Sequence, residues 1–370
     1  MNTKHIITMM LLIGYSGLVS AAPLTLTTWN TEHLMSEERF KEWKDFCGPL
    51  NWPDNRDTTL PDEIRDKLSK KPPRLTYCNA LSWPKPVRTI NDHREKVSSL
   101  QSLAQQLKSD IYFFQEISDA KAIEELLSDK AYTSISSFEL LKDTVMPQNV
   151  GIAYRKGLFD KEPLISVNTD VMVLHESSSG HKRPVRPGIE LHGSINGKKL
   201  AFLNLHMKSS CHEYELDNSK ADCQTYAKQV VKIEEWIEKM TEDGIDFILL
   251  GDFNRVFKVD WSYDARSDGS DAQSSPTKDS KTRSFLHEIN DNKPENLAIY
   301  YAPNVFLRKF SDWNCYEKID RFFLSKAFAE TLIWKTPVLG LEAHGKNYPN
   351  FSKDKVKPSD HCPITLTLPL

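Results

Sequence analysis

Short apolar runs alternate with longer amphipathic stretches along most of this chain. The apolar runs predict strands at 24–30, 111–116, 149–154, 171–174, 189–192, 200–206, 247–250, 319–324 and 364–368. Between them, 94–107 and 221–240 repeat apolar residues at helical spacing, and the charged stretch 61–69 predicts a shorter helix. This alternation is typical of an α/β fold, and a four-layered sandwich of two packed mixed β-sheets flanked by helices satisfies the order.

Three segments fall outside this pattern. Residues 1–21 carry Lys4, an apolar run from Ile6 to Val19 and small residues ending at Ala21, which predicts a cleaved signal peptide, with a retained membrane anchor as the alternative. We expect residues 22–370 to form a single domain, interrupted by a Pro- and Trp-rich insertion at about 36–93. The stretch 267–281, rich in Ser, Asp and Lys, predicts a mobile surface loop.

The cysteines agree with export to a periplasm or out of the cell. There are 6, an even number, and their spacings do not resemble a zinc site, so we expect disulfides. Cys47–Cys78 and Cys211–Cys223 are favoured because each pair flanks a loop-like stretch, although fifteen connectivities are possible for six cysteines. Cys315–Cys362 would follow if the strands carrying Asp320 and His361 lie side by side.

Polar side chains stand where two of the apolar runs begin or end. Gly251-Asp252-Phe253-Asn254 directly follows one run, and Ser359-Asp360-His361 precedes the last one. Such positions lie at the rim of a sheet, where a substrate can reach them. Carboxylate, amide and imidazole groups are what the metal-assisted hydrolysis of a phosphate ester needs. The formal net charge of −3 argues against a protein that coats DNA, but not against a nuclease.

The order of these motifs along the chain resembles that of the endonuclease/exonuclease/phosphatase superfamily, whose fold is DNase I-like. Six motifs carry the resemblance: Thr28-Trp29-Asn30, Phe114-Gln115-Glu116, Asn204-Leu205-His206, Gly251-Asp252-Phe253-Asn254, Ile319-Asp320-Arg321-Phe322 and Ser359-Asp360-His361. Each motif is weak alone, but six in this order are specific. The resemblance covers nearly the whole chain after residue 21, apart from 36–93 and the Ser-rich loop.

The resemblance implies a metal site built from oxygen ligands. Glu116 is expected to anchor a divalent cation, with Asn30 and Asp360 completing or supporting the oxygen shell. Mg²⁺ is the expected ion because it accepts few carboxylates and keeps several waters, with Mn²⁺ or Ca²⁺ as alternatives.

The remaining motif residues receive catalytic roles from the same resemblance. Asp252 would orient or deprotonate the attacking water, and Asn254 would donate to a phosphoryl oxygen, where negative charge builds up. His361 would bind the phosphate or position the nucleophile, and Asp320 would fix its tautomer. Asp320 paired with Arg321 is the simpler alternative. His206 would act as general acid or phosphate contact, as in DNase I-like enzymes and sphingomyelinases; the abasic-site repair branch usually has a Tyr there.

Three further residues are candidate substrate contacts. Glu32 faces the same rim as Asn30 if strand alternation continues. Arg183 or Arg186 could reach the scissile phosphate, and the sequence does not choose between them. The other histidines have no partner pattern and are predicted to be surface or loop residues: His33, His93, His181, His192 and His212.

The sequence therefore predicts an exported, metal-dependent nuclease with DNA as its substrate and RNA as a further candidate. We expect it to work as a monomer without an obligate protein partner. One alternative is a sphingomyelinase or phospholipase C that binds phospholipid headgroups, which would need an exposed apolar hairpin for docking. The only candidates for such docking are Trp43, Trp52 and Trp83 in the insertion. The other alternative is a non-catalytic effector module on this fold.

Overall fold

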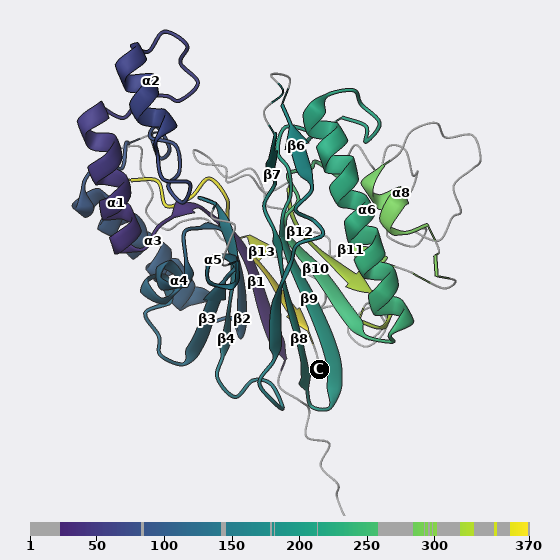
Figure 1. Cartoon of the computed structure of the whole chain (residues 1–370). Helices are drawn as coiled ribbons and strands as arrows, with labels where there is room; N and C mark the ends of the chain where they lie inside the picture. The colour runs from purple at the N-terminus through teal and green to yellow at the C-terminus, as the bar shows by residue number, and fades with distance from the viewer. Residues whose placement is uncertain are drawn as a thin grey trace, which may run out of the picture.

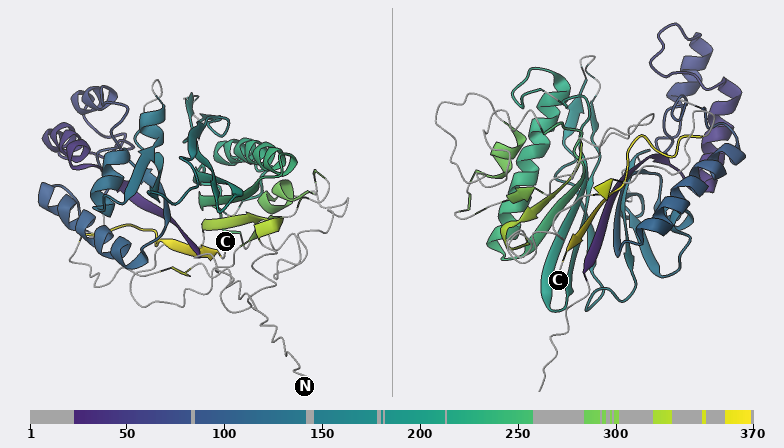
Figure 2. Two further views of the ribbon diagram at one scale, coloured as in Figure 1. Left: turned by 90° about the horizontal axis from the view of Figure 1, so that it is seen from below. Right: turned by 180° about the vertical axis from the view of Figure 1, so that it is seen from behind.

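Two β-sheets pack face to face, with helices on both outer faces (Figures 1 and 2). The computed structural model describes residues 23–82, 85–141, 146–177, 180, 182–212, 214–257, 284–291, 293–294, 297, 299–301, 319–328, 344–345 and 356–368. Within these ranges, the predicted layering of helix, sheet, sheet and helix is confirmed. The signal segment, the loop 267–281, His181, Trp83 and Cys315 lie outside the described residues.

The first sheet, called sheet A, has six strands in the order β13-β14-β1-β2-β4-β3. β1 pairs in parallel with β2 and antiparallel with β14, so Leu24 lies opposite Leu368. The strands of sheet A are β1 (Leu24–Leu34), β2 (Ile111–Ile117), β3 (Tyr132–Ser136), β4 (Asn149–Arg155), β13 (His344–Gly345) and β14 (Ile364–Leu368).

The second sheet, sheet B, also has six strands, in the order β11-β12-β10-β9-β8-β5. β9 and β10 are parallel and β12 runs against β10. Its strands are β5 (Leu164–Asn168), β8 (Gly188–Ile195), β9 (Lys198–His206), β10 (Asp246–Asp252), β11 (Ile299–Tyr301) and β12 (Asp320–Ser325). A separate two-stranded hairpin, β6 (Leu174–Glu176) and β7 (Lys182–Pro184), rises beside the upper end of sheet B in Figure 1.

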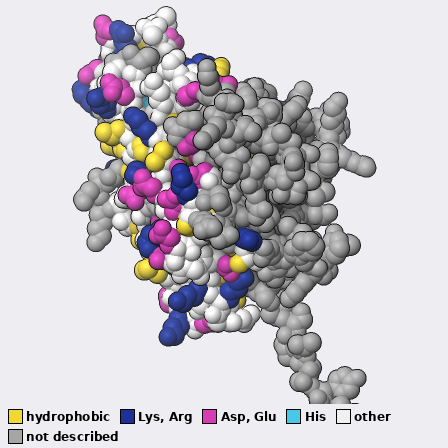
Figure 3. All heavy atoms as spheres, turned by 90° about the vertical axis from the view of Figure 1, so that its right-hand side faces the viewer, with side chains coloured by type: hydrophobic (Ala, Val, Ile, Leu, Met, Phe, Trp, Pro, Cys, Tyr) yellow, Lys and Arg dark blue, Asp and Glu magenta, His cyan; other side chains and the backbone are white. Residues whose placement is uncertain are grey.

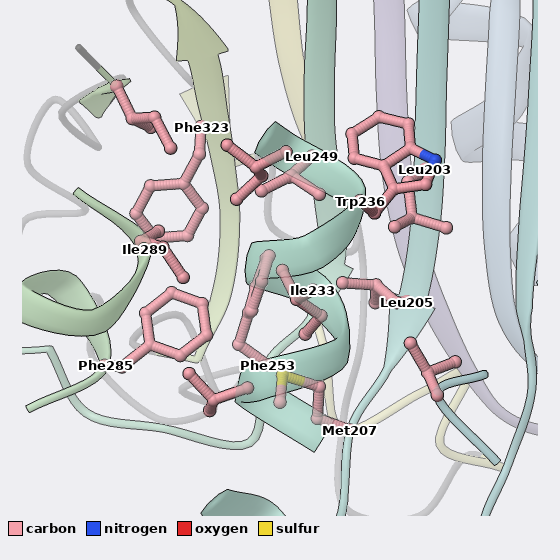
Figure 4. Packing of buried hydrophobic residues seen from close by; sticks show 14 of the residues in the cluster. Leu203, Leu205, Met207, Ile233, Trp236, Leu249, Phe253, Phe285, Ile289 and Phe323 are labelled. Carbon is pink, nitrogen blue, oxygen red and sulfur yellow. The ribbon is translucent and has the colours of Figure 1, made fainter. Parts of the chain in front are cut away.

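Strand alternation gives each sheet an inner and an outer apolar face. The inner faces meet in a buried core that includes Leu26, Phe113, Phe202, Leu250 and Phe322. α3 (Ile90–Leu107) and α4 (Ala120–Leu127) cover the outer face of sheet A; α5 (Ser137–Leu140) is a short turn before β4. α6 (Ala221–Glu242) and α8 (Phe285–Ile289) cover sheet B, as Figure 4 shows for the labelled side chains of α6 against those of β9 and β10.

The predicted insertion at 36–93 is itself folded. It contains α1 (Glu37–Cys47), the 3₁₀ turn η1 (Gly48–Leu50) and α2 (Asp62–Ser69), and it runs into the start of α3. Its small core includes Phe40, Trp43, Cys47 and Cys78, all with 0% exposure. In Figure 1 it rises on one side of the upper end of the sheets, opposite the β6–β7 hairpin.

The disulfides match two of the predicted pairs. Cys47 is bonded to Cys78 and Cys211 to Cys223. Cys362, the described member of the third predicted pair, is also disulfide-bonded, and its predicted partner Cys315 lies outside the described residues. The strands named for this pair do not lie side by side in one sheet, because β12 begins at Asp320 in sheet B and β14 follows His361 in sheet A.

Two details of the strand predictions also change. Residues 171–173 lie outside any strand, and the extended stretch there begins at Leu174. Two of the histidines predicted at the surface, His33 and His93, are instead buried.

The described surface mixes both signs of charge. On the side shown in Figure 3, acidic and basic side chains are interspersed, and α6 carries the exposed ion pairs Lys232–Glu235 and Lys239–Asp243. Among the described residues, no helix has the length and apolarity to cross a bilayer.

Candidate active site

The predicted site residues gather at one end of the sandwich, where strands of both sheets finish. β1 and β2 are parallel, as are β9 and β10, so Glu116 comes from the end of β2 and His206 and Asp252 from the ends of β9 and β10. β12 runs the other way and begins at Asp320, directly opposite Asp252. His361 lies just before β14. Residues far apart in the chain thus meet at one rim.

A buried polar contact joins the two sheets behind this rim. Gln115 Nε2 donates to Asn204 Oδ1 at 2.6 Å, and Asn204 Nδ2 donates to the Phe114 carbonyl at 3.0 Å. Both side chains have 0% exposure. Because an unmet amide is costly in a dry interior, this pair fixes how β2 and β9 face each other.

Asp252 lies at the centre of the site's hydrogen bonds. Its Oδ1 accepts from the backbone N–H of Asn254 at 2.8 Å, and its Oδ2 accepts from Asn30 Nδ2 at 3.0 Å. His206 Nε2 lies 3.4 Å from the same Oδ2. Burial, together with the nearby charge of Asp320, raises the pKa of Asp252 to about 7, although the opposing charge of His361 lowers it. A carboxylate with donors on both oxygens is held in one orientation.

His361 and Asp320 form the predicted pair. His361 Nδ1 lies 2.6 Å from Asp320 Oδ2, and His361 Nε2 points toward Asp252 at 3.9 Å from Oδ2. Burial alone would lower the pKa of His361, but the charges of Asp320 and Asp252 outweigh it and raise the pKa well above its usual value. His361 is therefore a cation at neutral pH, with one N–H used by Asp320 and the other directed to the site.

His206 differs from His361 in its protonation state. Burial first, and then the positive charges of Arg186 and His361, hold its pKa well below the usual value, so the ring is neutral. Nε2 lies between Glu116 Oε1 at 3.6 Å and Asp252 Oδ2 at 3.4 Å, which favours the Nε2–H tautomer. Among the described residues, none is within hydrogen-bonding distance of its buried Nδ1.

Glu116 is placed by an irregular backbone. It has a φ of 58°, and the β2–β4 register shifts between Gln115 and Ile117. The β1–β2 register shifts between Asn30 and Leu34, where Glu32 and His33 also have positive φ. The result brings the backbone N–H of His33 to 3.3 Å from Glu116 Oε2, and its ring Nε2 to 3.6 Å from the same oxygen.

The donor set suits a hard divalent cation. Glu116 and Asp360 are carboxylates that keep 16% and 34% side-chain exposure, and the side-chain carbonyl oxygen of Asn30, on β1, accepts from the Glu32 N–H at 3.0 Å. Mg²⁺ needs only one or two such carboxylates, since waters fill its remaining positions. A second group, Asp252, Asp320 and His361, has ligand atoms within 4.8 Å of one another. A protonated imidazole cannot ligate a metal, so Glu116 is the better anchor.

Of the candidate substrate contacts, Glu32 is held in an ion pair and Arg183 is exposed. The positive φ at Glu32 breaks strand alternation, and its carboxylate pairs with Lys357 at 2.7 Å. Arg183 lies on the exposed β7 strand. Arg186 is the one held at the site: its Nε donates to the His206 carbonyl at 3.1 Å and its Nη1 to Gln148 Oε1 at 3.1 Å.

Two more contacts complete this rim. The Glu32–Lys357 pair ties the end of β1 to the segment that carries Asp360, and the buried Lys96 donates to the Pro358 carbonyl in the same segment. Asn254 has a φ of 50° and donates through Nδ2 to the Met207 carbonyl at 3.1 Å, which leaves one amide hydrogen for a substrate oxygen.

Comparison with known proteins finds similar chains by structure alone. No family model matches this chain, and no curated protein matches it by sequence. The chain is similar to an endonuclease/exonuclease/phosphatase protein of Bacteroides vulgatus, with 13% identity, a TM-score of 0.46 and coverage of 94% of this chain and 99% of that one. It is also similar to the human Nocturnin catalytic domain, with 11% identity, a TM-score of 0.44 and coverage of 93% and 92%.

A third similar structure is the mannosyl-6-phosphatase of Bacteroides thetaiotaomicron, with 14% identity, a TM-score of 0.40 and coverage of 93% and 98%. With identities this low, the activity has to be argued from the site itself.

Proposed function

We propose that this protein is a metal-dependent phosphoester hydrolase, and more specifically an exported nuclease. The observation that carries the proposal is the single rim where Glu116, His206, Asp252 and the His361–Asp320 pair meet. It combines an oxygen-rich cation anchor with a buried imidazolium and a carboxylate held by fixed donors. In-line attack on phosphorus needs this combination, because the nucleophile must be oriented and negative charge on the phosphoryl oxygens must be stabilised.

Each residue has a role that follows from its state. Asp252 orients the attacking water and takes its proton, since its pKa of about 7 suits a base at neutral pH. His361, as a cation, binds a phosphoryl oxygen through its Nε2–H. His206 keeps Glu116 and Asp252 apart and stands near the leaving oxygen. Glu116, with Asn30 and Asp360, would hold Mg²⁺, which neutralises charge on the transferring phosphate when bound.

Several observations favour a nuclease over a lipid phosphodiesterase. Trp43 is buried with 0% exposure, and the half-buried Trp52 packs against it, so both rings contribute to the core of the insertion. The β6–β7 hairpin has the exposed Leu174, but its second strand reads Lys182-Arg183-Pro184. A basic strand beside the rim suits an extended phosphate backbone better than an apolar surface. Two disulfides support export, since such bonds persist in oxidising compartments.

The deciding experiment is nicking of supercoiled plasmid by residues 22–370 with Mg²⁺, beside an EDTA control. Asp252→Ala should lower turnover by about a thousandfold or more, because it removes the base and an anchor of the site. Asp246→Ala is the matched control: Asp246 lies at the other end of β10 and pairs with Lys198. Cleavage that survives EDTA or the Asp252→Ala substitution would overturn the proposal. Failure on DNA and RNA with turnover of sphingomyelin would favour the lipid alternative.

A further inference from the structure

Tyr77 is an exposed aromatic side chain at the edge of the site. Four large apolar or aromatic side chains among the described residues are exposed: Tyr77 at 44%, Leu164 at 68%, Leu174 at 59% and Tyr214 at 41%. Of the two aromatics, Tyr77 is the one that contacts a site residue. Its ring meets that of His33 edge to face, with centroids 5.3 Å apart at 89°, and its hydroxyl lies 3.4 Å from His33 Nε2.

His33 connects Tyr77 to the predicted cation anchor. The same Nε2 lies 3.6 Å from Glu116 Oε2, while Nδ1 lies 3.2 Å from the Thr76 hydroxyl. The Tyr77 hydroxyl stays protonated, because burial and the charges of Glu116 and Glu32 raise its pKa to about 12. Tyr77 is therefore separated from Glu116 by the His33 side chain alone, and it presents a neutral ring near an anionic carboxylate.

The backbone that carries Tyr77 is held from several sides. The next residue, Cys78, is bonded to Cys47 of α1. Trp43 Nε1 donates to the Tyr77 carbonyl at 3.3 Å, and the Cys78 N–H donates to Asn55 Oδ1 at 3.4 Å. An exposed ring on a backbone fixed in this way costs little conformational entropy to order on binding. Such pre-organisation suits a residue that recognises a substrate, and the contacts that provide it belong to the insertion.

We propose that Tyr77 determines specificity by stacking on an unpaired base next to the scissile phosphate, so that the enzyme prefers single-stranded nucleic acid. The inference rests on the proposed nuclease function and adds to it the form of the substrate. A ring at the rim can reach a base face only where neighbouring bases leave that face open, as they do in a single strand. Stacking tolerates any base, so no sequence preference is expected from Tyr77.

The test uses a short single-stranded oligonucleotide with one cleavable linkage, all others being phosphorothioates. A second version replaces the two nucleotides flanking that linkage by tetrahydrofuran abasic units. On the intact strand, Tyr77→Ala should lower kcat/KM by about 5- to 100-fold, the usual effect of losing one stacking contact. On the abasic strand the same variant should stay within about twofold of the wild type.

Two further variants complete the design. Tyr77→Phe keeps the ring and loses the hydroxyl, so it should cleave the intact strand like the wild type. Tyr214→Ala removes a tyrosine of similar exposure that packs beneath Lys220. It should leave kcat/KM unchanged on both the intact and the abasic strand. Melting temperatures of all variants show that they are folded.

The outcomes separate the two proposals. Equal losses on intact and abasic strands, a Tyr77→Phe defect as large as that of Tyr77→Ala, or no loss in either variant would each overturn the stacking inference while the nuclease function stands. If the wild type cleaves neither nucleic acid, the nuclease proposal fails and this inference fails with it.

Discussion

The two sheets bring their polar residues to the same rim in different ways. Sheet B does so with an unbroken ladder: His206, Asp252 and Asp320 lie directly opposite one another on β9, β10 and β12. Sheet A breaks its register twice, near Glu32 and near Glu116, and both residues have positive φ. The regular strand ends align His206, Asp252 and Asp320, whereas the irregular ones position Glu116, the proposed cation ligand.

The difference is one of cost as well as geometry. Non-glycine residues with positive φ each cost about 1 kcal/mol or more, and they persist only when the surroundings hold them. In sheet A these surroundings are the contacts of Glu32 with Lys357 and of Glu116 with His33. We therefore expect sheet A to carry the strain and the metal affinity, and sheet B to carry the register and the proton transfer.

The largest expected effect is on sheet A. Glu116→Gln keeps the shape of the side chain but removes the charge that anchors the cation, so activity should fall about a hundredfold or more and Mn²⁺ affinity about tenfold or more. Calorimetric titration with Mn²⁺ measures the second quantity apart from turnover. Glu124→Gln on α4, which changes an exposed carboxylate paired with Lys121, should alter neither. Unchanged Mn²⁺ affinity would remove Glu116 from the metal site.

The next effect tests the register of sheet B. Gly251 has a φ of 130°, and a Cβ there would meet the Leu205 carbonyl oxygen at 2.0 Å. Gly251→Ala should therefore lower the free energy of unfolding by about 3 kcal/mol or more, through strain and forced strand separation. Gly197→Ala, in the open β8–β9 turn with a φ of 77°, should cost only about 1 kcal/mol. Urea unfolding measures both. Equal losses would mean that the close approach at β9 is not what fixes the ladder.

A third prediction compares the stabilising effects of the two disulfides, one beside each sheet. Cys47–Cys78 spans 31 residues beside sheet A, and Cys211–Cys223 spans 12 beside sheet B. Paired serine substitutions should each lower the free energy of unfolding by about 3 kcal/mol, slightly more for the longer loop, because the unfolded chain gains entropy. Thermal unfolding of the two double variants provides the comparison. A melting temperature that stays the same when both bonds are absent would contradict it.

The smallest effect concerns pH and the packing of the insertion on α3. His93 stacks on Phe40 with ring centroids 4.4 Å apart, and burial lowers its pKa from 6.5 to about 4. Above the unfolded pKa neither state is protonated, so His93 adds no pH dependence there. As the pH falls below 6.5, His93 binds a proton in the unfolded state but not in the folded state. The free energy of unfolding therefore declines until about pH 4.

His93→Phe keeps the stack and removes this proton. We compare the free energy of unfolding of His93→Phe with that of the wild type at two pH values. Between about pH 7.5 and about pH 5, this difference should shift by about 2 kcal/mol in favour of the variant. Urea unfolding at the two values measures it, with His192→Phe as a partly exposed histidine for comparison. A difference that does not depend on pH would show that His93 is not the acid-sensitive group.

The two sheets also differ in how well their site residues can be predicted from the sequence. In sheet B, Asp252 directly follows one continuous apolar run and Asp320 lies at the start of another, so both could be placed at strand ends from the pattern. The same rule is less reliable in sheet A, because the register shift and the positive φ at Glu32 interrupt the alternation there, and His33, which the rule leaves unassigned, lies against Glu116. A shift in register is set by tertiary contacts with segments such as 356–360, which strand alternation does not encode.

The insertion shows the same limit at a larger scale. Its cysteine pairing and the helix near 61–69 could be read from spacing, whereas its Tyr77 gave no signal, since nothing local marks an exposed ring beside a carboxylate that is distant in sequence. The motifs at the strand ends allowed their chemistry to be predicted from the sequence. The contacts that pre-organise the rim are long-range, and they become visible only in three dimensions.

The pairing of β1 with β14 has a consequence for when activity arises. β1 carries Asn30, yet one of its edges is completed by a strand more than three hundred positions further along, with Leu24 opposite Leu368. His361 reaches Asp252 only once that distant strand has docked. Contacts between such remote segments form late in folding. An emerging chain therefore cannot assemble the site at this rim until β14 has paired with β1.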